Sequence, residues 1–165
     1  MNRRQILWGG ASVAVLGTAI WGSRLSSRPA LADGPFPFTL TDAQWRARLS
    51  PAAYDVLRQG GTEYPGSSPL LNEHRAGIFS CAGCALPLFD AKTKFESGTG
   101  WPSFYEPLPH AVETSDDTSM GMDRTEVHCS RCGGHLGHVF NDGPPPTGLR
   151  YCMDGVALTF TPASA

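Results

Sequence analysis

The sequence predicts a mainly β domain that opens with short helices and is tied together by a metal site. This fold class follows from short runs of β-branched and aromatic residues, from Gly- and Pro-rich turns between them, and from two Cys-x-x-Cys pairs. The expected strands cover residues 77–81, 126–129, 137–140 and 156–160.

Two short helices are expected before the first strand. Thr41 or Asp42 can cap the first, because short polar side chains accept hydrogen bonds from the free N–H groups of a first turn. Ser50 can cap the second, with Pro51 in its first turn and Gly60 at its end.

Residues 1–32 predict an export signal rather than part of the domain. Arg3-Arg4 form a twin arginine, residues 6–22 are uncharged and moderately apolar, and Ala-Leu-Ala at 30–32 fits a cleavage site. We expect this leader to be removed, leaving one domain at 33–165, and the protein to be exported to the periplasm by the twin-arginine route. The alternative is an uncleaved leader that anchors the protein to the membrane, although the apolar run is short for a span.

The charge of the expected mature chain argues against nucleic acid as a partner. The full sequence has 13 basic and 15 acidic residues, and the leader holds four of the basic residues and no acidic ones. Nine basic residues then face 15 acidic ones, a net charge of −6. Phosphate binding needs clustered lysines and arginines, which this composition does not favour. We expect a monomer.

Four cysteines form two close pairs that can hold one metal ion. These are Cys81 with Cys84 and Cys129 with Cys132. Four thiolates suit a tetrahedral structural zinc with no open coordination position. Forty-four residues separate the pairs, so the metal would join two distant turns. Two local disulfides, or a redox-active pair, are the alternatives.

The fifth cysteine stands apart from these pairs and is a candidate nucleophile. Cys152 lies two residues after Arg150, and on a strand both side chains would share one face, so the cation would favour the thiolate. His135 and His138, with Asp142 four residues later, can supply an acid and an orienting carboxylate. The alternative is that the cysteine and the histidines only pack in the core.

A Gly-rich segment at 97–104 adds a possible pocket wall. Trp101 stands between Gly100 and Pro102, where a turn can present the indole face to a ligand. A core tryptophan under a loop is the alternative.

Together these segments resemble a known enzyme family. Residues 93–104, both cysteine pairs, residues 134–144 and Arg150-Tyr151-Cys152 are similar to those of peptide-methionine (R)-S-oxide reductases, the B-type methionine sulfoxide reductases; residues 57–63 also resemble the family's opening helix and loop. The similarity covers about residues 38–160. It implies a fold of two antiparallel β-sheets with short N-terminal helices, and one structural zinc away from the active site.

The resemblance also implies roles for individual residues. Cys152 would attack the sulfur of methionine-R-sulfoxide in oxidised proteins, and His138, with His135 beside it, would protonate the sulfoxide oxygen. Asp142 and Arg150 would orient and tune this pair. Trp101 would form the wall around the substrate's methyl group, in a substrate-binding set that also holds Phe140 and Asp154. Cys152 would be left as a sulfenic acid.

Two positions depart from the family pattern. Thr99 stands where many members carry a resolving cysteine, so we expect a thioredoxin-like or other external thiol to reduce the sulfenic acid. Asp154 stands where the family often has asparagine, and its charge could raise the pKa of Cys152.

Two other function classes compete with this interpretation. A zinc-stabilised binding module would not need Cys152, the two histidines, Arg150 and Trp101 together. A general thiol–disulfide oxidoreductase would need a cysteine pair free of metal. The sequence therefore favours an exported enzyme that repairs oxidised methionine.

Overall fold

The structure is a computed structural model that describes residues 36–164. The expected leader at 1–32, with its cleavage site, lies outside the described residues. Within this range no helix is long and apolar enough to cross a membrane.

Two capped helices open the described part of the chain. They are α1, Asp42–Arg48, and α2, Pro51–Gln59. Thr41 begins α1 with a capping box, in which its hydroxyl accepts from the Gln44 N–H and the Gln44 side chain accepts from the Thr41 N–H. Ser50 caps α2, and Gly60 ends it in a left-handed conformation that glycine adopts without strain. Both predicted helices are confirmed.

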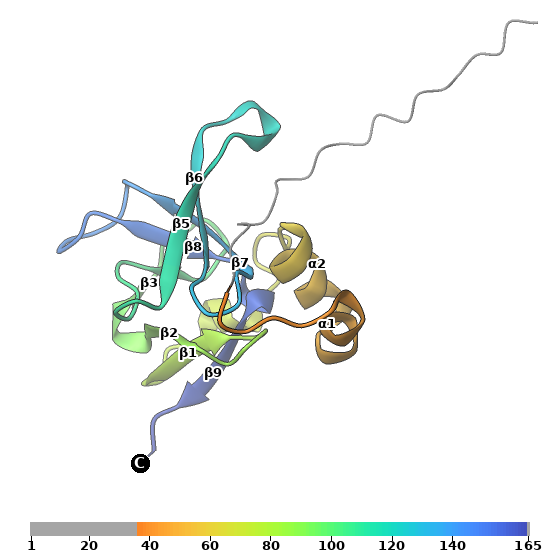
Figure 1. Cartoon of the computed structure of the whole chain (residues 1–165). Coiled ribbons are helices and arrows are strands. Elements are labelled where there is room, and N and C mark those ends of the chain that lie inside the picture. Colours follow the sequence, from red (N-terminus) through yellow and green to blue (C-terminus); the bar gives the residue numbers. More distant parts are fainter. Residues whose placement is uncertain (1–35, 165) are drawn as a thin grey trace, which may run out of the picture.

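All strand pairings are antiparallel, and the strands form two sheets (Figure 1). The smaller sheet has the order β2-β1-β9, with β1 Gly77–Cys81, β2 Pro87–Asp90 and β9 Leu158–Pro162. The larger sheet has the order β3-β4-β8-β7-β6-β5, with β3 Lys94–Phe95, β4 Ser103–Phe104, β5 Val112–Asp117, β6 Arg124–Cys129, β7 His135–Phe140 and β8 Arg150–Met153. The predicted fold class is therefore confirmed.

The last predicted strand begins later than the sequence suggested. Residues 155–157 form a short 3₁₀ helix, η4 Gly155–Ala157, and β9 starts at Leu158. The Ala157 N–H donates to the Asp154 carbonyl, and the Glu63 carboxylate accepts from the N–H groups of the two residues between them. These donors are therefore not available to a sheet ladder. Three further 3₁₀ helices lie in loops: η1 Pro69–Asn72, η2 Ala91–Thr93 and η3 Ser119–Gly121.

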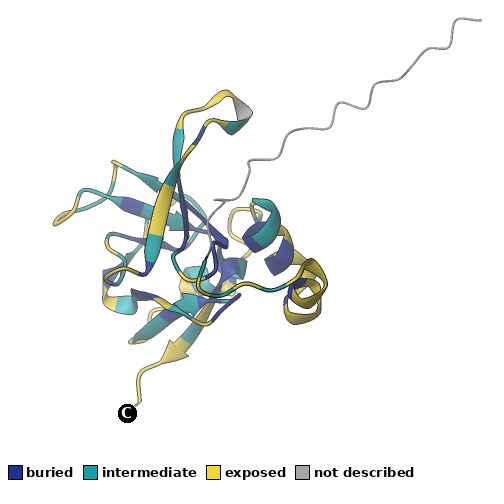
Figure 2. Ribbon diagram, in the orientation of Figure 1, coloured by how far each residue is buried: buried dark blue, intermediate teal, exposed yellow. Residues whose placement is uncertain are grey.

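The core lies between the two sheets and under α2, where the buried residues gather in Figure 2. Phe104 joins the sheets: its ring stacks on Phe89 with centroids 4.3 Å apart and meets Phe79 edge-on at 5.0 Å. Leu57 of α2 is also fully buried. Burying large aromatic side chains supplies much of the stability of a domain this small. This core fixes the back of β4, the strand beside β8.

One glycine lets β7 and β8 lie close together. Gly137 has a φ of +144°, and a Cβ at this position would lie 2.1 Å from the Cys152 carbonyl oxygen. A side chain would therefore push β7 away from the strand that carries Cys152. The close pairing of these two strands positions the candidate active site.

Candidate active site and metal centre

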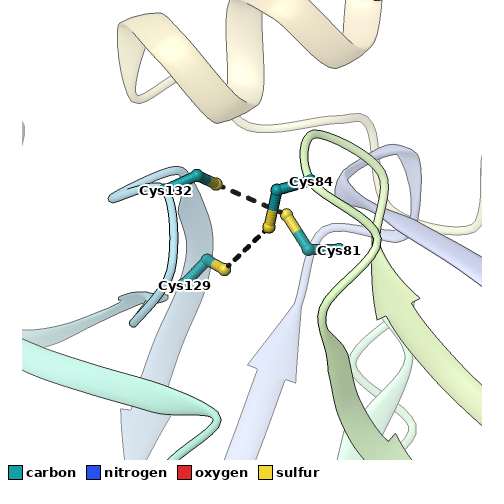
Figure 3. Close-up of side chains that lie close together, drawn as sticks. All are labelled: Cys81, Cys84, Cys129 and Cys132. Atoms are coloured by element: carbon teal, nitrogen blue, oxygen red, sulfur yellow. Dashed lines mark hydrogen bonds between the residues drawn. The ribbon is translucent and has the colours of Figure 1, made fainter. Parts of the chain in front are cut away.

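The four paired cysteines meet in one buried cluster (Figure 3). One pair lies at the end of β1 and in the turn that follows it, and the other lies at the end of β6 and in the turn before β7. The sulfur atoms all lie within 4.8 Å of one another. The structure thus brings together, from distant segments, the residues that the sequence predicted as metal ligands: Cys81, Cys84, Cys129 and Cys132.

The cluster has the shape of a tetrahedral thiolate site. The Sγ atoms of Cys81 and Cys132 lie 3.7 Å apart, and those of Cys84 and Cys129 lie 3.5 Å apart. Sulfurs bound about 2.3 Å from a tetrahedral zinc ion lie about 3.8 Å from one another. A disulfide would need a sulfur–sulfur distance of about 2.05 Å, and all four cysteines are free. The cluster could therefore hold one metal ion, consistent with a structural zinc.

Three arginines hold the carbonyls of the cysteine turns. Arg58 donates to the Cys132 carbonyl at 3.0 Å, and Arg131 donates to the Cys84 carbonyl at 3.2 Å. Arg48 donates to the carbonyl of Gly83, between the cysteines of the first pair, at 2.7 Å. Their positive charges would offset part of the negative charge of four thiolates.

Cys152 lies in the middle of the larger sheet, on β8 between β4 and β7. It pairs directly with His138 on one side and with Ser103 on the other. Residues paired directly across antiparallel strands project to the same face of the sheet. The structure thus brings the predicted nucleophile and the predicted acid together.

Several neighbouring groups shift the pKa of the Cys152 thiol. Burial raises its pKa, and the charge of Asp154 adds to this effect. A hydrogen bond with Thr99, the Arg150 guanidinium and a hydrogen bond with Ser103 oppose it. Thr99 Oγ1 lies 3.7 Å from Cys152 Sγ. The net effect is a raised pKa, so the resting side chain is a thiol at neutral pH.

Arg150 is fixed by Asp142 and Phe140. The guanidinium donates to both Asp142 carboxylate oxygens, at 2.8 and 2.9 Å, and lies over the Phe140 ring at 4.4 Å. This bidentate pair lowers the pKa of Asp142. Asp142 thus holds the arginine that acts on Cys152, and the Phe140 ring packs against the same guanidinium.

His138 has a carboxylate partner that the sequence analysis did not find. Its Nε2 atom lies 2.8 Å from Asp117 Oδ2 at the end of β5, and Arg124 donates to the same oxygen at 2.7 Å. Burial lowers the pKa of His138, while the Asp117 hydrogen bond works in the opposite direction. An ionised carboxylate only accepts hydrogen bonds, so Nε2 carries a hydrogen and Nδ1 is the nitrogen that exchanges its proton.

His135 also has a carboxylate partner, which is Glu126. Its Nδ1 atom lies 2.7 Å from Glu126 Oε1, and Ser115 donates to the other Glu126 oxygen at 3.0 Å. The rings of His135 and His138 lie 5.4 Å apart. His135 Nε2 is buried and has no hydrogen-bond partner among the described residues, with Asp154 Oδ2 3.9 Å away. The Asp154 carboxylate is therefore the charged group that faces this nitrogen.

Asp154 and Trp101 both contact the loop that follows α2. Asp154 is buried, with 3% of its surface exposed, and its Oδ1 accepts from the Glu63 N–H at 2.9 Å. The Trp101 indole N–H donates to the Glu63 carbonyl at 3.3 Å. Burial raises the pKa of Asp154 to about 6. Asp154 therefore joins two chain segments.

Sequence reasoning missed four residues of this site: Glu63, Asp117, Arg124 and Glu126. A partial signal exists, because residues 124, 126 and 128 alternate along one strand and so share a face. The pairing of β6 with β7, which puts this face beside the histidines, could not be read from that alternation.

Comparison with known proteins agrees with this arrangement. A family model described as the SelR domain matches residues 49–162. The chain is 53% identical over 131 residues to the peptide methionine sulfoxide reductase MsrB of Leifsonia xyli subsp. xyli, which covers 78% of this chain and 94% of that protein. It is 57% identical over 123 residues to the MsrB of Thiobacillus denitrificans, covering 74% and 93%, and 58% identical over 120 residues to the MsrB of Pseudomonas entomophila, covering 72% and 92%. The chain therefore belongs to the SelR domain family of MsrB peptide methionine sulfoxide reductases, which are oxidoreductases.

Proposed function

We propose that this protein reduces the R epimer of methionine sulfoxide in oxidised proteins, with Cys152 as the nucleophile. The observation that carries the proposal is the direct pairing of Cys152 with His138 across β8 and β7. A sulfoxide oxygen leaves sulfur only when it is protonated. A nucleophile must therefore reach the sulfur while an acid reaches the oxygen.

In the proposed reaction, Cys152 gives up its thiol proton as Sγ attacks the sulfoxide sulfur, and that proton replaces the one that His138 donates to the sulfoxide oxygen. The sulfur–oxygen bond of the substrate breaks and methionine leaves. The oxygen ends on Cys152 as a sulfenic acid, so the substrate gains two electrons and the cysteine loses two. The hydrogen bond with Asp117 favours the protonated form of His138 that this step requires.

The other residues orient the substrate and the two reacting groups. Arg150, held by Asp142 over Phe140, favours the thiolate form of Cys152. His135 lies beside His138, with ring centroids 5.4 Å apart, and Glu126 holds its Nδ1 atom, so this ring supports the acid. Trp101 forms the wall around the substrate's methyl group.

Two external thiols complete the proposed cycle. They reduce the Cys152 sulfenic acid to the thiol, release water and become a disulfide. Thr99 stands beside Cys152 and cannot form a disulfide, and the other four cysteines lie in the metal cluster. A thioredoxin-like protein is a reductant of suitable chemistry.

We propose in addition that the cluster holds one zinc ion with a structural role. Cys81, Cys84, Cys129 and Cys132 would hold it, and the ion would cross-link the turn after β1 to the turn between β6 and β7. Four cysteine ligands leave no position for a substrate. Elemental analysis of the purified protein should give one zinc per chain, and a metal-free, fully active protein would contradict this role.

The decisive experiment for the reaction uses separated R and S epimers of dabsyl-methionine sulfoxide with dithiothreitol. The protein should reduce the R epimer alone, and Cys152→Ser should abolish the reduction while the protein keeps its fold and metal. If folded, metal-loaded protein reduces neither epimer, the chain is a binding module of the same fold.

The export of this enzyme is a separate proposal that rests on the twin arginine and the cleavage site in residues 1–32. The repair of oxidised exported proteins would follow from that location. Cell fractionation should place the full chain in the periplasm with a new N-terminus at Asp33. The variant with Arg3→Lys and Arg4→Lys should stay in the cytoplasm, and its normal export would contradict the twin-arginine route.

A further inference from the structure

Glu63 uses all of its polar groups to join segments that flank the active site. Its backbone N–H donates to Asp154 Oδ1 at 2.9 Å, and its carbonyl accepts from the Trp101 indole at 3.3 Å. Its carboxylate accepts from the Gly155 N–H at 2.5 Å and from the Val156 N–H at 3.2 Å. The residue thus connects the tryptophan to the segment that follows Cys152 and Met153.

The loop around Glu63 fits closely against the same two segments. Gly66 donates to the Gly100 carbonyl at 2.7 Å, and a Cβ on Gly100 would lie 2.8 Å from the Pro65 side chain. A Cβ on Gly155 would lie 1.9 Å from the hydroxyl of Ser68, which is buried. The loop therefore has little room to move relative to either segment.

The carboxylate of Glu63 is the part of this arrangement that a substitution can remove. Two backbone N–H groups of η4 would otherwise lack an acceptor, and hydrogen bonds to an ionised acceptor are about twice as strong as neutral ones. The two backbone contacts of residue 63 depend on where the loop lies, so they weaken when the side chain no longer anchors it.

We propose that Glu63 is a positioning residue that sets the distance between Trp101 and Cys152 and thereby the size of the substrate's methyl pocket. This inference rests on the proposed function, because it assigns Trp101 to the wall of that pocket. Loss of the anchor lets the indole retreat, so the pocket accepts a larger group than methyl.

A comparison of two substrates tests this role. The kcat/KM values of N-acetyl-methionine-R-sulfoxide and N-acetyl-ethionine-R-sulfoxide, which differ by one methylene, would be measured with dithiothreitol. A pocket that fits methyl should prefer the methionine substrate by roughly tenfold or more. In Glu63→Ala we expect this preference to fall to below about threefold, since the wall no longer excludes the extra methylene.

The change in preference separates positioning from general damage. A variant that is merely less folded loses kcat/KM equally for both substrates and keeps the wild-type ratio. Glu63→Gln keeps one carbonyl acceptor and should give an intermediate ratio. Glu73→Ala is the matched control, because the Glu73 carboxylate pairs with Arg75 in its own loop at 2.6 Å, and it should keep the wild-type ratio.

A double-mutant cycle links the effect to the indole. Trp101→Ala should lower the preference by itself, and adding Glu63→Ala should then change the ratio no further. A wild-type ratio in Glu63→Gln and Glu63→Ala, or in Glu63→Gln alone if the alanine variant does not fold, overturns the inference. An inactive wild-type protein would instead overturn the proposed function.

Discussion

The four-cysteine cluster and the candidate active site both depend on cysteines, but they are assembled in different ways. Each half of the four-cysteine cluster is local, with two cysteines three residues apart, and only the meeting of the two halves is long-range. In the candidate active site almost every contact of Cys152 comes from another strand or loop: His138, Ser103 and Thr99. A local turn can be recognised in a sequence, whereas the chemistry of Cys152 depends on strand register.

The same two sites also differ in the groups that shift the pKa values of their cysteines. The thiols of the four-cysteine cluster hydrogen-bond one another, which lowers the pKa of Cys84 and Cys129 and raises that of Cys81 and Cys132. Cys152 instead lies among hydroxyl groups, one arginine and one carboxylate. The first environment suits a shared cation, and the second suits a thiol that becomes a thiolate only when it reacts.

The largest expected effect separates the two kinds of cysteine. Cys132→Ser should lose the bound metal and several kcal/mol of unfolding free energy, because a metal that joins distant turns contributes directly to folding. Cys152→Ser should keep the metal and the melting temperature but lose sulfoxide reduction. Elemental analysis, thermal unfolding and the dabsyl assay measure all three. A metal-loaded, stable Cys132→Ser protein would break the comparison.

The second prediction concerns the carboxylate on His138. Asp117→Asn should lower kcat by roughly tenfold to a hundredfold, because general acid catalysis of this kind depends on the protonation state of the acid. The ionised carboxylate opposes the lowering of the His138 pKa. Its loss lowers that pKa further, so the fall in activity with rising pH should occur at lower pH than in the wild type.

The neighbouring residue provides the control for that experiment. Asp116 lies next to Asp117 on β5, is exposed and projects to the other face of the sheet. Asp116→Asn should keep both kcat and the pH profile. An identical pH profile in Asp117→Asn and the wild type would show that Asp117 does not act on the acid.

The third prediction changes the path of the catalytic cycle rather than its rate. Thr99→Cys places a second thiol where an oxygen now lies 3.7 Å from Cys152 Sγ. After one turnover without reductant, this variant should lose two hydrogens by mass spectrometry as a disulfide forms between residues 99 and 152. The wild type should instead form a sulfenic acid that reacts with dimedone. Persistent dimedone labelling of the variant would mean that the two side chains cannot approach to bonding distance.

The smallest expected effect on turnover belongs to Asp154. Asp154→Asn can keep the hydrogen bond from the Glu63 N–H through its amide oxygen. Removing the charge should lower the pKa of Cys152, so the alkylation of Cys152 by iodoacetamide near neutral pH should be faster than in the wild type. Equal alkylation rates would show that the aspartate leaves the nucleophile unchanged.

The same substitution should change stability in a defined pH range. Burial raises the pKa of Asp154 from 3.8 to about 6, so the folded state favours the protonated acid. This contribution is present below pH 4 and is lost as the pH rises from about 4 to about 6. Asp154→Asn should therefore gain up to about 3 kcal/mol over the wild type above pH 6, and nothing from this source below pH 4. Urea unfolding at pH 4 and pH 7 measures the difference.

The sequence predicted those parts of the fold that depend on neighbouring residues. Thr41, Ser50 and Gly60 mark the helix ends by local hydrogen bonds and backbone conformation, and the cysteine pairs mark the metal turns. The strands β2, β3, β4 and β5 were not predicted, and residues 150–152 were treated as a strand only in the argument that places Arg150 and Cys152 on one face. Strands of two to four residues are too short for a hydrophobic period to show, and β5, although six residues long, is mostly polar.

In the candidate site, too, local features were predicted from the sequence and contacts set by strand register were not. The proximity of Cys152, His138 and Arg150 was expected from motifs close in the sequence, and Arg150 was expected on the same face as Cys152. Asp117 and Glu126 were not found, because their contacts with the histidines follow from the registers of β5 with β6 and of β6 with β7. A shift of one residue in either register would turn these carboxylates to the opposite face.

The pairing of β1 with β9 has a consequence for how the protein is made. Residues 77–81 pair on one side with β2, which follows closely in the chain, but their partner on the other side is 158–162. The small sheet therefore stays incomplete while the ribosome is still adding the residues between them. Cys81 also lies on β1, and its neighbours in the cluster, Cys129 and Cys132, are synthesised much later. During synthesis the chain therefore carries an open strand edge and unshielded thiols, and release of the last strand from the exit tunnel ends this vulnerable period.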